Sequence, residues 1–164
     1  MTRLCGFLGL LLAASTGWSA DGKLTAVDGP PAGVNDAVKA VLAPTGHQVS
    51  ADGSAICTIW LAKSLAVKSD FKPSLNVKYP FMPGQLIGVM RVDKASEFTD
   101  FRGQEVAAGV YTLRYGQQPV DGNHVGTSEL YDFLLAIPAA KDADPAEIKS
   151  LEELIKKSAA TAGS

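Results

Sequence analysis

The sequence predicts a mainly β protein, an antiparallel β-sandwich with a short helix near the N-terminus and an amphipathic helix near the C-terminus. Three observations support this. Short apolar runs are separated by connections that contain Gly and Pro, helical periodicity is confined to the two ends, and no helical crossover separates consecutive strands. The chain has 164 residues, 46% of them hydrophobic and 20% charged, which suits one domain.

The first twenty residues have the pattern of a secretory signal peptide. Arg3 precedes an apolar run at 4–14, and small residues lead to a predicted cleavage after Ala20. The run is too short to cross about 30 Å of hydrocarbon comfortably, and no charged stop-transfer segment follows it. We therefore expect an exported protein, periplasmic or extracellular, with no transmembrane segment once residues 1–20 are removed.

Removal of the signal leaves one cysteine, Cys57, so no disulfide can form within the chain. Cys57 lies in an apolar, β-prone run at 56–61. A nucleophilic thiol needs exposure to solvent and a nearby cation. The apolar run around Cys57 indicates burial and contains no cationic residue. The sequence therefore predicts a buried, inert thiol.

The N-terminal half divides into an arm, a helix and a hairpin. Residues 21–33 are polar and rich in Gly and Pro, which indicates a flexible arm. A helix is predicted at 34–43, with Asn35 as its N-cap. Strands at 48–50 and 55–63 then read as a hairpin, and the second strand is apolar on both faces, as expected for a central strand of a sandwich.

The rest of the domain is predicted to be three strands and long connections. Residues 71–84 contain three prolines and should be irregular or edge structure. Strands are expected at 85–92, at 110–115, where apolar and polar residues alternate, and at 131–137. The segment 116–130 between the last two strands is a long loop.

The C-terminal helix is predicted from its capping signals. Asp144 is placed as N-cap, Pro145 at the first helical position and Glu147 to complete a capping box. Its apolar face would consist of Ile148, Leu151, Leu154 and Ile155. A single domain thus spans 34–158, and the tail 159–164 should fray.

Charge and motifs exclude several function classes. The chain has 15 Lys and Arg against 17 Asp and Glu, a net charge of −2, with no basic cluster of the kind that binds nucleic acid. No nucleophile elbow, phosphate-binding loop or dinucleotide fingerprint occurs. We therefore expect no nucleic-acid partner and no cofactor.

The loop 116–130 is the candidate functional surface, because a structureless loop of this length in a compact domain is usually functional. Its polar side chains can donate and accept hydrogen bonds. The alternative is that the same side chains hydrogen-bond the loop to itself and hold it in one shape. The candidate ligand-binding residues are Asp121, Asn123, His124 and Glu129.

Two functions remain open at this point. The first is a non-catalytic exported module that binds a small ligand, a glycan or a protein partner through the loop. The second is a metal-dependent hydrolase that uses His124 with nearby carboxylates, and a metal held by His47 together with His124 would fit it. The absence of enzyme motifs favours the first.

Much of the chain after residue 46 resembles a group of exported bacterial proteins that has no assigned activity, so the resemblance implies export alone. The Gly109–Leu113 piece also resembles a strand entry of transthyretin-like and other small immunoglobulin-like sandwiches. The segments that carry the first resemblance are 46–49, 58–61, 84–89, 109–116, 118–126, 132–135 and 138–142.

Overall fold

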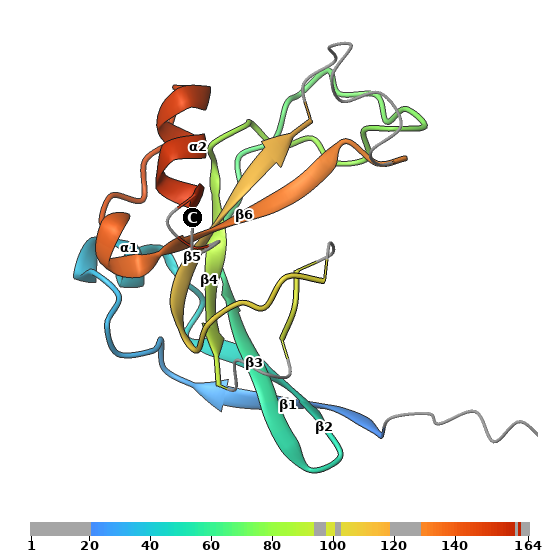
Figure 1. Ribbon diagram of the computed structural model, residues 1–164. Helices are drawn as coiled ribbons and strands as arrows, with labels where there is room; N and C mark the ends of the chain where they lie inside the picture. The colour runs from blue at the N-terminus through green and yellow to red at the C-terminus, as the bar shows by residue number, and fades with distance from the viewer. Residues whose placement is uncertain (1–20, 94–97, 101–102, 119–128, 160, 162–164) are drawn as a thin grey trace, which may run out of the picture.

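The computed structural model describes residues 21–93, 98–100, 103–118, 129–159 and 161, which form one six-stranded sheet with helices on one face (Figure 1). The strands lie in the sheet in chain order, and each pair of neighbours is antiparallel. The elements are β1 (Gly22–Asp28), α1 (Asp36–Val41), β2 (Thr45–Ala51), β3 (Ser54–Leu61), β4 (Leu86–Val92), β5 (Gly109–Gln117), β6 (Asp132–Pro138), the 3₁₀ helix η2 (Ala139–Lys141) and α2 (Leu151–Ala159).

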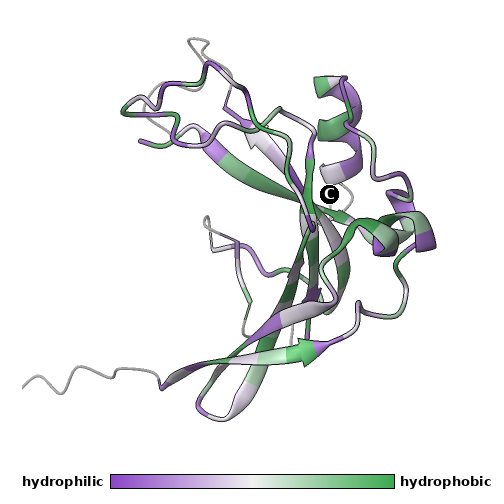
Figure 2. Cartoon of the chain, turned by 180° about the vertical axis from the view of Figure 1, so that it is seen from behind, coloured by the Kyte–Doolittle hydropathy of each residue, from purple (hydrophilic) through white to green (hydrophobic). Residues whose placement is uncertain are grey.

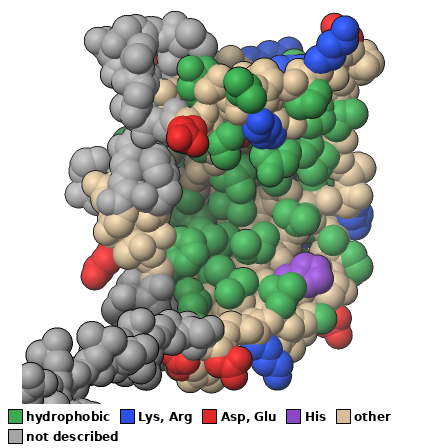
Figure 3. Space-filling model, turned by 90° about the vertical axis from the view of Figure 1, so that its right-hand side faces the viewer, with side chains coloured by type: hydrophobic (Ala, Val, Ile, Leu, Met, Phe, Trp, Pro, Cys, Tyr) green, Lys and Arg blue, Asp and Glu red, His purple; other side chains and the backbone are tan. Residues whose placement is uncertain are grey.

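The predicted mainly β, antiparallel architecture with a C-terminal helix is confirmed, but the sheet is open. The described residues do not form the second sheet that a sandwich requires. The helices and the segment around η2 supply the second layer instead, and they lie on the same face of the sheet (Figures 1 and 2). The other face, called here the open face, is seen in Figure 3.

Most predicted elements of the N-terminal half are confirmed. The Asn35 side chain caps α1 by accepting from the backbone N–H of Ala37, and β2 and β3 form the expected hairpin. The expected flexible arm at 21–33 is corrected, because its first part is the strand β1, paired with β2 from Gly22 to Asp28. Nearly all of β1 is exposed, so its side chains carry no core pattern, and its backbone pairing defines it as a strand.

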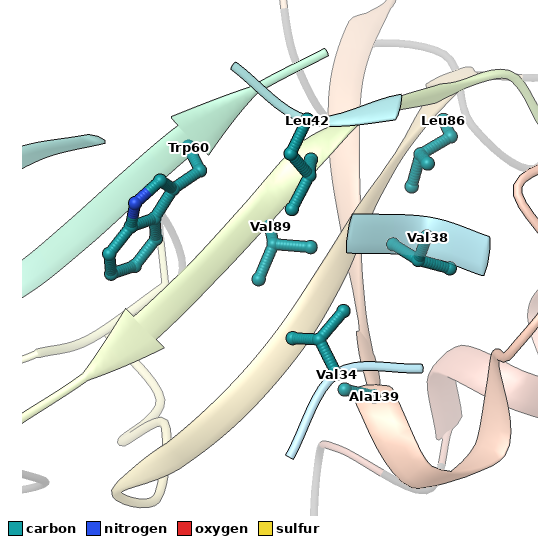
Figure 4. Close-up of a cluster of buried hydrophobic side chains, with 7 residues drawn as sticks. All are labelled: Val34, Val38, Leu42, Trp60, Leu86, Val89 and Ala139. Atoms are coloured by element: carbon teal, nitrogen blue, oxygen red, sulfur yellow. The ribbon is translucent and has the colours of Figure 1, made fainter. Parts of the chain in front are cut away.

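The core of the covered face is built around Trp60 and Val89, which are directly opposite on β3 and β4 (Figure 4). Val38 of α1 packs onto them. Gly46 of β2 lies flat against the indole, where a Cβ atom would come within 2.5 Å of the ring. The whole cluster consists of Val34, Val38, Leu42, Trp60, Leu86, Val89 and Ala139.

A buried ion pair fastens the C-terminal part of the chain to this face. Arg114 of β5 is completely buried and donates to both carboxylate oxygens of Asp142, at 2.8 and 2.9 Å. Its remaining N–H groups donate to backbone carbonyls, and Thr112 donates its hydroxyl to Asp142 as well. The carbonyls that accept from Arg114 are those of Gly84, Asp144 and Ala146.

This arrangement also explains why α2 begins later than predicted. The Asp144 carboxylate does accept from the N–H of Ala146, as an N-cap would, but the carbonyls of this segment bond to Arg114 and cannot continue into a helix. The helix begins at Leu151 instead, where the Ser150 hydroxyl accepts from the N–H of Glu153.

The predicted apolar face of this helix is only partly buried. Ile148, which precedes α2, packs with Leu154 against Ile137 of β6. Leu151 and Ile155 are about half exposed, at 51% and 54%. Because it begins late, the helix has only nine residues. Leu154 is the one side chain of α2 that is buried.

Replacing Arg114 by Met should lower the free energy of unfolding by about 3–5 kcal/mol, because Asp142 would stay buried without its cation. Urea unfolding followed by circular dichroism measures this loss. Arg91→Met is the matched control, since the ion pair of Arg91 with Asp93 (2.8 Å) is partly exposed and should contribute about 1 kcal/mol or less. Equal losses in the two variants would contradict a central role for Arg114.

Replacing Trp60 by Ala should cost about 3–5 kcal/mol, because the variant leaves a cavity between α1 and the sheet. Tyr79→Ala, at a half-exposed aromatic residue, should cost less than about 1 kcal/mol. Thermal and urea unfolding of both variants test this difference, and a Trp60→Ala protein as stable as the wild type would place the core elsewhere.

Candidate functional site

The open face of the sheet is a hollow floored by hydrophobic side chains (Figure 3). Side chains alternate between the two faces of a strand, so the residues next to those in the covered core point to this side. The buried members of the cluster on this side are Cys57, Met90, Val92, Val106, Tyr111 and Leu113, and the half-buried members are Val49, Ile59, Phe98 and Ala136.

The strand register makes the apolar surface continuous. Ile59 lies opposite Met90, and Met90 lies opposite Tyr111, so one apolar row crosses β3, β4 and β5. A second row pairs Leu113 with Ala136 across β5 and β6. No helix of the described residues lies on this side. Met90, Tyr111 and Leu113 in the rows are nevertheless buried, at 5–6% exposure, and Ile59 and Ala136 at the ends of the rows are partly exposed.

Two pieces of chain border the floor. Phe98 and Val106, from the connection between β4 and β5, pack against the cluster. Toward the β6 side, the ring of Phe81 stands edge-on to Tyr115, with ring centroids 5.6 Å apart, and Tyr79 stacks on Phe81 at 5.9 Å. An aromatic series therefore leads from the sheet to the connection between β3 and β4.

The tyrosine hydroxyls of this face are already hydrogen-bonded. Tyr115 donates to the carboxylate of Asp132, and Tyr111 donates to the carbonyl of Ala107 at 2.7 Å. Burial raises the pKa of both hydroxyls, and for Tyr115 the hydrogen bond to Asp132 raises it further. Both hydroxyls therefore stay neutral, and each donates to an acceptor within the protein.

Cys57 belongs to the floor of the open face. The prediction that it is buried is confirmed, since its side chain is 4% exposed. Burial, and secondarily the charge of Asp93, raises the pKa of the thiol. A raised pKa keeps the sulfur protonated at neutral pH, which opposes nucleophilic chemistry.

The structure places two of the predicted site residues. Glu129 is exposed, and its backbone carbonyl accepts from the side chain of Asn76. His47 is exposed on β2, opposite Ile59. Asp121, Asn123 and His124 lie outside the described residues, so the pairing of His47 with His124 stays a prediction. Within the described ranges, no three His, Cys, Asp or Glu residues gather into a metal site.

A polar pocket of about 380 Å³ lies between α2 and the segment before it. Its wall includes the carboxylate of Asp142, which Arg114 already neutralises. Lys157 at the pocket lies 3.9 Å from Asp142 and 3.1 Å from Glu153. Since the charges of Asp142, Lys157 and Glu153 are already paired within the protein, we assign these groups a structural role.

Sequence reasoning overlooked the open face, although a signal for it was present. The run at 56–61 is apolar on both faces, and we interpreted it as a strand between two sheets. One of its faces packs under α1 through Trp60, while the other, with Cys57 and Ile59, belongs to the open face. Strand patterning shows that both faces are apolar but not what covers each.

Comparisons with known proteins add no family to these observations. The chain matches no family model, and no match is found among curated proteins or solved structures. In the part of the chain that the structure describes, no helix has the length and apolar character needed to span a membrane.

Proposed function

We propose that this chain is an exported, non-catalytic binding module that takes up an apolar or amphiphilic small molecule on the open face of its sheet. The observation that supports this is the apolar cluster across β3 to β6, on the side that carries none of the described helices. Ile59 and Ala136 of this cluster are partly exposed, and Leu61 and Leu134, which share their side of the sheet, are about half exposed. Large uncovered apolar surfaces are costly in water, and on soluble domains they are usually binding sites.

The shape and chemistry of the face favour a slender apolar ligand over the other expected classes. A glycan needs many free hydrogen-bonding groups, whereas the hydroxyls of Tyr111 and Tyr115 are already engaged. A second copy of the same hollow face would not fit into it, because two concave surfaces do not complement each other. An acyl chain fits a hollow lined by aliphatic, Met and Tyr side chains.

The loop at 116–130 adjoins this face at its described ends. Gln117 at the end of β5 donates to the hydroxyl of Tyr115, at 3.1 Å, and Asp132 at the start of β6 accepts from the same hydroxyl. We retain the predicted role of the loop as a contributor of polar contacts to the head of an amphiphile. Export also remains part of the proposal, supported by the pattern of residues 1–20.

Titration with the fluorescent apolar probe N-phenyl-1-naphthylamine tests the proposal. We expect saturable binding of the probe, and Ile59→Gln should weaken it about tenfold because the variant removes an apolar side chain from the floor. Val49→Gln provides a second test at a half-buried neighbouring position, should the first variant fold poorly.

Leu151→Gln is the control for this experiment. Leu151 is exposed on α2, which covers the other side of the sheet. The control should bind the probe like the wild type. Absence of saturable binding, or an equal loss in the Leu151 variant, would reject the open face as the site. Circular dichroism of each variant verifies that it is folded.

Cys57 provides a second, independent test, because its thiol lies in the floor of the proposed site. Iodoacetamide should modify the native protein slowly and the urea-unfolded protein rapidly, since the thiol is buried and its pKa is raised. Saturation with the probe should slow the native reaction further. Equal rates for native and unfolded protein would mean that the thiol is exposed.

A further inference from the structure

Residues 62–83, which form most of the connection between β3 and β4, differ in charge from the rest of the chain. It contains four lysines and one acidic residue, Asp70, a net charge of +3. The remainder of residues 21–164 has a net charge of −6. The lysines of this basic segment are Lys63, Lys68, Lys72 and Lys78.

The basic segment also exposes large apolar side chains. Leu75 is 86% exposed, the highest value among the exposed large hydrophobic residues of the described chain. Val67 and Tyr79 are more than half exposed, and Met82 is also exposed. In Figure 2 hydrophobic and hydrophilic stretches alternate along this segment. Positive charge and apolar tips thus occur together on one connection.

Hydrogen bonds hold the tip of the segment in a defined shape. The N–H of Ser74 donates to the carbonyl of Val77, and the Ser74 hydroxyl accepts from the N–H of Val77 at 3.0 Å. Asn76 then ties this turn to the chain before β6, through the carbonyl of Glu129 and the N–H of Tyr131. Leu75 is therefore presented by a fixed turn.

We propose that the basic segment docks onto the surface of a bilayer that contains anionic lipids. Lysines near such a surface are attracted by its negative potential. Leu75 and Val67 would enter the boundary of the acyl region, and Tyr79 suits the interface because its ring is apolar and its hydroxyl polar. The ammonium groups of Lys63 and Lys78 donate to the carbonyls of Ala40 and Ser74, so Lys68 and Lys72 are the lysines proposed to reach the headgroups. Their apolar stems can lie against lipid.

The arrangement of the side chains favours a lipid surface over an acidic protein. The exposed apolar residues alternate with lysines along an irregular connection, whereas protein interfaces have a contiguous apolar core with a polar rim. A fluid interface accommodates separate side chains without a matching surface. Three acidic side chains, Asp70, Glu129 and Asp132, lie in the segment or next to it, and the four lysines outnumber them.

The position of the basic segment links it to the open face. Tyr79 and Phe81 belong to this segment and stack on each other, and Phe81 contacts Tyr115 of β5. Docking there would bring the border of the apolar floor close to the lipid. The proposal rests on charge and exposure at 62–83 and does not require the ligand site of the preceding subsection.

Co-sedimentation with lipid vesicles tests the docking. Vesicles of phosphatidylcholine with about one third phosphatidylglycerol supply the anionic surface, and pure phosphatidylcholine vesicles are the neutral reference. Residues 1–20 would bind lipid by themselves if they were retained. The protein is therefore expressed from its full coding sequence, and its intact molecular mass shows whether residues 1–20 have been removed. Variants are compared only between preparations in which the same residues are present.

We expect binding to the anionic vesicles at low salt, weaker binding to the neutral ones, and loss of binding in about 0.5 M NaCl. Lys68→Gln with Lys72→Gln should weaken binding about 25-fold, at about fivefold per lysine. Leu75→Ser should weaken it at least about tenfold, since the side chain no longer enters the lipid.

Matched controls on the opposite side of the sheet separate this surface from the general charge of the protein. Lys141→Gln with Lys149→Gln removes the same charge from exposed positions outside the basic segment, and Leu151→Ser removes an exposed leucine from α2. These controls should bind like the wild type. Ile59→Gln should also leave vesicle binding unchanged, which keeps this test independent of the ligand site.

Three outcomes would overturn the proposal. They are no binding to anionic vesicles at low salt, binding that ignores both salt and lipid charge, and equal losses in the test and control variants. In the first case an acidic protein becomes the favoured partner of the basic segment.

Discussion

The buried guanidinium of Arg114 determines how the second half of the chain is arranged. It connects β5 to the carboxylate of Asp142 and to three backbone carbonyls that lie before β4 and after η2. Gly84, one of these partners, has φ of +84°, and a Cβ atom there would come within 1.9 Å of the Ile148 carbonyl oxygen. The close approach of the two segments thus needs both the arginine and the glycine.

The hydrogen bonds of Arg114 determine which face of the sheet the C-terminal helices lie on. They hold the chain from Asp142 to Ile148 against one face, so that α2 follows on the same side as α1. The other face carries no helix of the described residues, and Phe98 and Val106 from the connection between β4 and β5 pack against its apolar cluster. The middle of this cluster is buried, so its partly exposed members, such as Ile59, are the ones that the proposed binding surface would use.

The two proposed surfaces are adjacent, which gives them a common physical interpretation. The open face suits an apolar chain, the basic segment suits an anionic interface, and the contact between Phe81 and Tyr115 lies between them. An amphiphile at a bilayer surface has both properties, an acyl chain and a headgroup region. The two proposals together would place the acyl chain of an amphiphile on the open face and its headgroup beside the anionic interface.

The sequence by itself determined the elements that local interactions define. The Asn35 cap, the hairpin of β2 and β3 and the strands β4, β5 and β6 depend on neighbouring residues, on turns and on alternation, so their positions could be predicted. The burial of Cys57 followed from the apolar run that contains it. The tertiary structure decided the rest. The strand β1 exists through its backbone pairing with β2, and α2 begins at Leu151 because Arg114 occupies the carbonyls of Asp144 and Ala146. Which apolar face stays open depends on the same long-range hydrogen bonds, and side-chain periodicity carries no information about a partner thirty residues away.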